Sequence, residues 1–127
     1  MNILLLGSKE YPFHSSYKYD KYAGGGIEVH VEKLAKYLIL HKYNVFIITR
    51  LFPELKRVEI RDNLDIIRVN FINNRLLRTF SYNFLSFFYA IKIISKEKID
   101  IVHCHGPIAG LFGVLIKILT NKLNYKL

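Results

Sequence analysis

The stretch Ala23-Gly24-Gly25-Gly26-Ile27-Glu28-Val29-His30 decides the fold, because it joins a glycine-rich loop to a strongly periodic helix. We predict that this helix runs from about Ile27 to His41. Its apolar face is predicted to consist of Ile27, Val31, Leu34, Ala35 and Leu38, which recur at helical spacing. The continuous apolar run Asn2–Gly7 comes before the loop and predicts a strand buried on both faces. A strand, a glycine loop and a helix in this order are typical of α/β sheets that bind ligand at the carboxyl ends of their strands.

The three glycines have two interpretations. Glycine has no Cβ, so a phosphate or a sugar can touch the backbone there. The first N–H groups of the helix lack partners inside the helix and favour an anion. Gly24, Gly25 and Gly26 are therefore candidate phosphate-binding residues. The alternative is a flexible hinge before a helix, which is common for glycine runs.

The remaining pattern alternates strands and helices, which predicts an α/β fold: a Rossmann-like parallel sheet with helices on both faces. The first two strands and the helix between them make a right-handed βαβ unit. A hairpin turns at Asp62-Asn63, and its second arm joins the main sheet as strand three. We expect the order 3-2-1-4, in which strand four is an unprotected edge. The later elements are strands at Asn44–Thr49, Arg57–Arg61, Leu64–Phe71 and Ile99–His105, and helices at Leu76–Lys96 and Ile108–Leu119.

Composition limits the class of protein. The 127 residues fit one domain, residues 1–127, and carry a formal net charge of +9. That charge favours an anionic partner, but the lysines are scattered, so we expect no nucleic acid. The single cysteine, Cys104, excludes an internal disulfide and indicates a cytoplasmic location. We expect no signal peptide and no transmembrane helix, because no apolar run reaches ~18 residues.

Aromatic residues gather in two segments. The loop from Ser8 to Ala23 contains tyrosines that could stack on a sugar or a base, or form a lid: Tyr11, Tyr17, Tyr19 and Tyr22. The helix Leu76–Lys96 is rich in phenylalanine, which is expected mainly to pack in the core. Basic residues near these phenylalanines leave open a peripheral contact with the inner face of the membrane. They are Arg75, Arg78 and Lys92.

The sequence His103-Cys104-His105 resembles a metal cluster only superficially. The two histidines project to one face of a strand, but no third ligand is near, so we expect no metal and no cofactor. His105 lies at the carboxyl end of the strand and could hydrogen-bond a sugar or a phosphate. His103 is expected to be structural, and Cys104 to be buried packing. The sequence also lacks the fingerprints of a dinucleotide fold, a P-loop and an α/β-hydrolase.

Taken in order, these motifs resemble the N-terminal domain of family 4 glycosyltransferases, which are retaining enzymes of the GT-B fold. The resemblance rests on four segments: Met1–Pro12, the run from Gly24 to Ala35, Asn44–Thr49, and the run from Asp100 to Pro107. It implies that Gly25 and Gly26 approach the diphosphate of the sugar donor. It also implies that Glu28 faces the acceptor pocket and that His105 lines the reaction centre, where it is the one candidate catalytic residue.

The resemblance implies a nucleotide-sugar donor and a glycan or lipid-linked acceptor as substrates. In the family, the donor is held mostly by a C-terminal domain with an E-x7-E motif. This sequence stops at Leu127, where the family's fifth strand is expected, so a truncated domain is predicted. We therefore expect the N-terminal half of a glycosyltransferase, inactive without a donor-binding domain or partner chain. The alternative is a non-catalytic product that binds a phosphorylated ligand or associates with a membrane.

Overall fold

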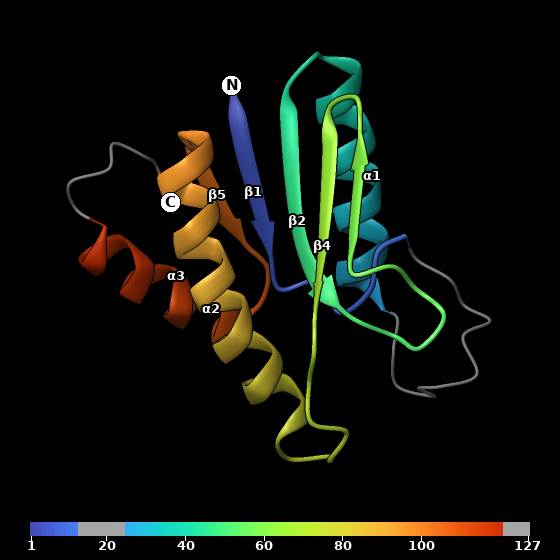
Figure 1. Ribbon diagram of the computed structural model, residues 1–127, viewed down its shortest axis with the longest axis vertical. Coiled ribbons are helices and arrows are strands. Elements are labelled where there is room, and N and C mark those ends of the chain that lie inside the picture. Colours follow the sequence, from blue (N-terminus) through green and yellow to red (C-terminus); the bar gives the residue numbers. More distant parts are fainter. Residues whose placement is uncertain (13–24, 121–127) are drawn as a thin grey trace.

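The computed structural model describes residues 1–12 and 25–120, and Figure 1 shows its arrangement of helices around one sheet. Every predicted element is present, and its bounds differ from the prediction by one or two residues, as helix and strand ends commonly do. The strands are β1 (Asn2–Leu6), β2 (Asn44–Arg50), β3 (Val58–Arg61), β4 (Leu64–Val69) and β5 (Ile101–Cys104). The helices are α1 (Gly26–Leu40), α2 (Arg78–Glu97) and α3 (Pro107–Leu119).

The five strands form one sheet in the order β3-β4-β2-β1-β5. All neighbours are parallel except the hairpin pair of β3 and β4. The predicted order is confirmed, since β4 is the third strand of that prediction and β5 the fourth. Within the described residues, β5 pairs only with β1, on one side. This topology places the carboxyl ends of β1, β2, β4 and β5 along one edge of the sheet.

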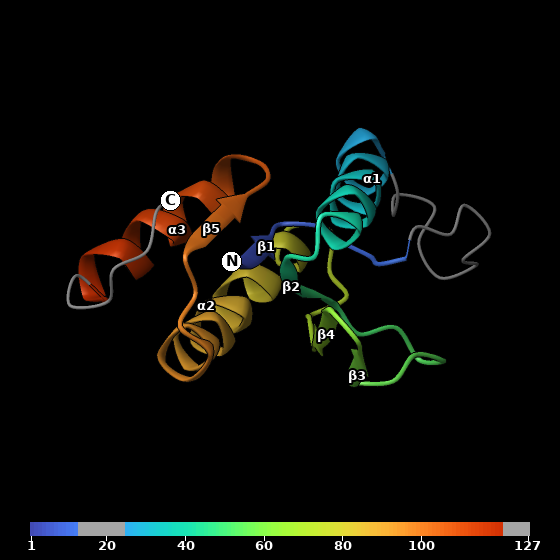
Figure 2. The same cartoon turned by 90° about the horizontal axis from the view of Figure 1, so that it is seen from above.

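Helices cover both faces of the sheet, as predicted. Figure 2 shows α1 on one side and α2 on the other, with α3 beside α2. The α1 face of the core contains Val31 and Ala35 packed on alternate residues of β1 and β2. The opposite face contains Tyr82, Ile94 and Ile116 packed on the remaining alternate residues. The continuous apolar strands therefore bury both of their faces, which is why their sequences do not alternate.

The buried face of α1 begins one residue later than predicted. Ile27 was expected on the apolar face, but its side chain is 38% exposed. Glu28 was expected off that face, beside the glycine loop, and it is buried at 3% exposure. The physical reason is a hydrogen bond: Glu28 Oε1 accepts from the backbone N–H of Lys9 at 3.0 Å. An acid can be buried where a backbone donor satisfies it.

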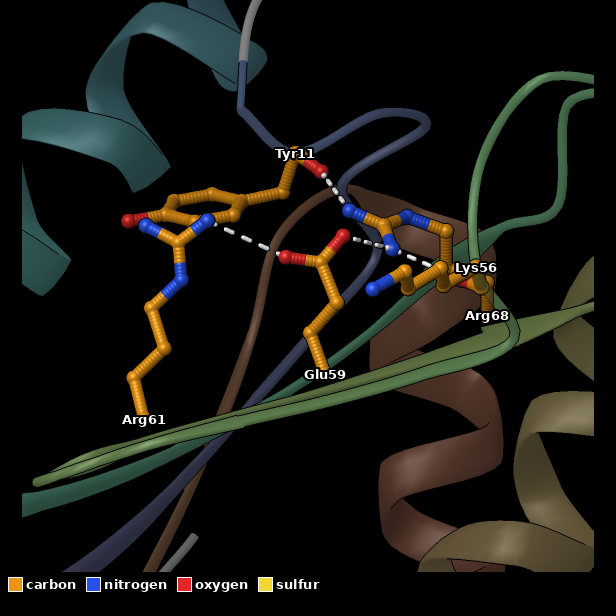
Figure 3. Close-up of polar contacts among 5 residues, drawn as sticks. All are labelled: Tyr11, Lys56, Glu59, Arg61 and Arg68. Atoms are coloured by element: carbon orange, nitrogen blue, oxygen red, sulfur yellow. Dashed lines mark hydrogen bonds and ion pairs between the residues drawn. The ribbon is translucent and has the colours of Figure 1, made fainter.

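A buried arginine connects three segments at the β3–β4 side of the sheet, as Figure 3 shows. Arg68, on β4, is 0% exposed. Its Nη1 atom donates to Glu59 Oε1 at 2.6 Å and to the carbonyl of Lys56 at 2.7 Å, while Nη2 donates to the carbonyl of Tyr11 at 2.8 Å. Arg61 binds the second oxygen of Glu59 from the exposed side, at 3.1 Å. The cluster anchors the loop after β1 and the hairpin to the sheet.

Candidate functional site

The carboxyl edge of the sheet is closely packed at Gly7, directly after β1. Gly7 has a φ of +98°, and a Cβ added there would lie 2.1 Å from the carbonyl oxygen of His105. The same added Cβ would also lie 2.9 Å from the Cβ atom of Ala109 in α3. Both the backbone conformation and the space therefore require glycine. This close approach brings the segment after β1 against the segment after β5, where His105 lies.

The glycine loop has open space in front of it. Among the described residues, a Cβ added at Gly26 would meet nothing within 4 Å, and one added at Gly25 would meet only the carboxylate of Glu28, at 3.7 Å. Gly25 is the N-cap residue of α1 and has extended backbone, which any residue can adopt. The fold therefore does not require glycine at either position. A ligand that approaches the backbone closely would require glycine there. Gly24 lies outside the described residues, as do Tyr17, Tyr19 and Tyr22.

Two predicted ligand residues differ in their surroundings. Glu28 connects the first turn of α1 to the loop after β1 through the N–H of Lys9, so it holds the two sides of the loop together. Its assignment to the acceptor remains a prediction. Tyr11 is buried at 6% exposure and packs in the core on the α1 side, so its ring is not available to stack on a ligand.

Three histidines meet near the end of β5. The rings of His103 and His105 stack with centroids 4.4 Å apart, as expected for side chains on one face of a strand. His30 of α1 meets His105 edge-on at 5.4 Å. Burial, followed by the charges of His103 and His30, lowers the pKa of His105 to about 4. His105 is therefore neutral near pH 7, and its buried Nε2 atom has no hydrogen-bond partner in the described residues.

His105 lines a cavity of about 190 Å³ at the carboxyl edge. The cavity is bounded by the ends of β1, β2 and β5 and by the first turns of all three helices. The wall includes Ile27 from α1, Thr79 from α2 and Pro107 from α3. His105, the residue predicted from the strand end, therefore lines a concavity, and its role there remains a prediction. In residues 1–12 and 25–120, no group of three His, Cys, Asp or Glu side chains is placed to hold a metal ion.

Cys104 points away from this cavity. It is half-buried and packs against the core cluster on the α2 side, as the strand periodicity predicted. Burial raises the pKa of its thiol to about 11, so the thiolate is scarce at neutral pH.

Sequence analysis missed a second cavity beside the first. It measures about 260 Å³, and its wall is basic. Its residues come from the loop after β1, the last residue of β2, the loop before α2 and the first turn of α2, so they are scattered in the sequence. The sequence signal that could have identified them is their position, since each ends a parallel strand or lies between such a strand and the first turn of the next helix. They are Lys9, Arg50, Arg75, Arg78 and Thr79.

The family model of glycosyltransferase family 4 matches residues 24–127. The α/β fold and the site at its carboxyl edge agree with that match, and the chain belongs to glycosyltransferase family 4. Its structure is similar to sucrose-phosphate synthase from Thermosynechococcus elongatus, with a TM-score of 0.70 and 18% sequence identity. The match covers 98% of this chain and 31% of that one, and it supports the fold of an N-terminal glycosyltransferase domain. A search of curated protein sequences finds no match.

Among the described residues, no helix combines the length and the apolar character needed to cross a bilayer.

Proposed function

We propose that these residues form the acceptor-binding part of a retaining glycosyltransferase that uses a nucleotide sugar. In this reaction the bond from the sugar's anomeric carbon to the diphosphate breaks, and a bond to an acceptor oxygen forms. The observation that carries the proposal is the meeting of two predicted site segments. The first turns of α1, which begins at Gly26 directly after its N-cap Gly25, reach His105, since the ring centroids of His30 and His105 are 5.4 Å apart.

Each residue has a proposed role. Gly25 and Gly26 leave the N-terminus of α1 open to the donor's diphosphate, because no side chain in residues 1–12 and 25–120 fills the space in front of them. His105, which is neutral at pH 7, can donate or accept a hydrogen bond at the reaction centre without carrying charge. Glu28 fixes the loop between these groups and faces the acceptor side. No cofactor or metal is assigned to the reaction.

Transfer also requires a firm hold on the nucleotide, and one helix terminus contributes only about 1 kcal/mol with an exposed anion. This is less than about tenfold in affinity. We therefore propose that a donor-binding domain, on the same polypeptide or on a partner chain, completes the site. These 127 residues alone are expected to bind nucleotide weakly and to transfer no sugar, since both substrates must be held together. We place the protein in the cytoplasm, in peripheral contact with the inner face of the membrane.

The test compares two glycines whose added Cβ meets open space. Gly26→Ala obstructs the proposed phosphate site, whereas Gly110→Ala in α3 is the matched control. Both variants should fold, because alanine is favoured over glycine in a helix by about 0.5–1 kcal/mol. Uridine diphosphate is titrated into each protein, and backbone amide shifts are followed by NMR.

The proposal expects shifts at the start of α1 that weaken several-fold in Gly26→Ala and stay unchanged in Gly110→Ala. Equal binding by both variants contradicts the glycine assignment. Sugar transfer by the pure 127-residue chain contradicts the need for a donor-binding domain.

A further inference from the structure

The two edges of the sheet differ in charge. β3, at one edge, carries Glu59 and Arg61, which form an ion pair at 3.1 Å. Charged side chains on an edge strand discourage pairing with another chain. β5, at the other edge, has the sequence Ile-Val-His-Cys, and burial lowers the pKa of His103, so this strand is uncharged near pH 7. In residues 1–12 and 25–120, β5 pairs only with β1, so its outer backbone groups have no strand partner there.

A hollow of about 400 Å³ runs along this free edge. It is lined by all four residues of β5, Ile101 to Cys104, and by Gly110 of α3. Successive side chains of a strand point to opposite faces, so a hollow that touches four in a row lies along the edge. A Cβ added at Gly110 would meet nothing within 4 Å among the described residues. The hollow therefore has room for an additional strand, which would lie about 4.8 Å from β5.

The helix beside this edge, α3, is apolar on two opposite sides. Its residues Ala109, Gly113 and Ile116 are buried, and it contacts both α2 and β5, as Figure 2 shows. A second stripe recurs at helical spacing and is 40–62% exposed: Leu111, Val114, Leu115 and Ile118. A helix that is apolar all round is typical of one that is buried all round. In the described part of the chain, the border formed by β5 and α3 thus has neither a strand against β5 nor an apolar surface against this stripe.

This β5–α3 border also differs in charge from the rest of the molecule. The whole chain has a formal net charge of +9, but residues 99–120, which contain β5 and α3, include only one acid, Asp100, and one lysine, Lys117. The formal charge of the border is therefore zero. An anionic partner would be attracted to the cations elsewhere, whereas the centre of a protein–protein interface is poor in charged residues. Two copies of this chain can meet at the border while most of their positive charges stay apart.

We propose that a second copy of this chain covers the β5–α3 border, so that the protein forms a symmetric dimer. A two-fold axis perpendicular to the sheet places the two β5 strands side by side and antiparallel, and each continues the sheet of the other. The same axis keeps both α3 helices on one face of the joined sheet, where their exposed stripes pack against each other. A lone peptide strand would cover the edge of β5 and leave the stripe exposed. The dimer goes beyond the proposed function and does not depend on it.

The first experiment measures the mass of the 127-residue chain by sedimentation velocity over a concentration series at physiological salt. The proposal expects a monomer that converts to a dimer, and to no larger species, as the concentration rises. Leu111→Lys puts a charge into the stripe and should weaken the dimer at least about tenfold. Leu40→Lys at the end of α1 is the matched control, because it is the same change at an exposed leucine outside the border, and it should leave the dimer unchanged.

A second experiment separates strand pairing from contact between the stripes. Gly110→Leu fills the hollow along β5 and leaves the stripe intact. The variant should fold, because the added side chain enters open space and leucine is favoured over glycine in a helix. It should lose the dimer, and amide hydrogen exchange in β5 should slow with concentration in wild type alone. Three results overturn the proposal: a monomer at every concentration, an equal loss in Leu40→Lys and Leu111→Lys, or a dimer that survives in Gly110→Leu.

Discussion

Arg50 and Arg68 lie near the carboxyl ends of the neighbouring strands β2 and β4, and both are almost completely buried. Arg68 is surrounded by acceptors: one carboxylate oxygen and two backbone carbonyls. Arg50 instead lies near two aromatic rings and lines a cavity together with three other cations. The comparison teaches that burial does not define the role of an arginine. Its surroundings do: Arg68 is bound by acceptors inside the fold, whereas Arg50 lines the wall of a cavity.

The largest effect is expected from Arg68→Ala. It removes all three contacts and leaves Glu59 without its closest partner, which should lower the free energy of unfolding by about 4 kcal/mol. Urea denaturation measures the change. Arg61→Ala is the control, because Arg61 binds the same carboxylate from an exposed position and should cost less than about 1 kcal/mol. Equal losses in the two variants would show that the burial of Arg68 carries no additional stabilisation.

The next prediction concerns Glu59→Gln, which keeps the size of the side chain and removes its charge. The loss should be about 2 kcal/mol, as for a hydrogen bond to a charged group. The hydrogen bond from Arg68 is the main cause that lowers the pKa of Glu59 in the folded protein. A lowered folded pKa means that the stabilisation is complete above the unfolded pKa of about 4.3 and is lost as pH falls through the folded pKa.

Denaturation of wild type and Glu59→Gln from neutral to acidic pH checks this sign. The difference in stability between them should be constant above about pH 5 and shrink below it. A difference that persists unchanged into strong acid would show that the charge of Glu59 contributes nothing.

A smaller effect is expected at Arg50. Arg50→Lys keeps the positive charge and loses the planar contact with Phe71 and Tyr82, which should cost about 1 kcal/mol of stability. Added phosphate should still stabilise the variant, but less than wild type, because lysine offers a point charge instead of a planar group. Thermal unfolding with and without inorganic phosphate measures both quantities. Phosphate stabilisation equal to that of wild type would mean that the guanidinium does not contact the anion.

The comparison also shows what the sequence could predict. The continuous apolar strands, the helical spacing and the Asp62-Asn63 turn were sufficient for the strand order, because burial on both faces and short connections leave few topologies. Glu28 was placed outside the apolar face because periodicity treats an acid as exposed. Its burial depends on the N–H of Lys9, 19 positions away, which local pattern does not contain.

The surroundings of the two arginines were harder to predict from the sequence. Arg68 is one polar residue within the predicted strand Leu64–Phe71, and its partners come from separate segments of the chain. The basic cavity gathers residues from two loops, the end of β2 and the first turn of α2, and no local motif marks it. His105 could be singled out from the sequence because it ends the predicted strand Ile99–His105 in a short motif. Only the fold itself brings the cations of the cavity together.

The smallest effect on stability, and the sharpest test of the comparison, is expected from Arg75→Gln. Arg75 is exposed, and its replacement by glutamine removes one of the four positive charges in the cavity wall. The free energy of unfolding should therefore change by less than about 0.5 kcal/mol without ligand, and the change should be slightly stabilising because repulsion falls. With saturating inorganic phosphate, wild type should become the more stable of the two proteins, because it binds the anion more tightly and is stabilised more by it. Thermal unfolding in a phosphate titration measures this crossing of the two curves, with Lys33→Gln as the variant of equal charge. If Arg75→Gln and Lys33→Gln behave alike at every phosphate concentration, the cavity contributes no more than the net charge of the molecule, and Arg50 is a structural arginine like Arg68.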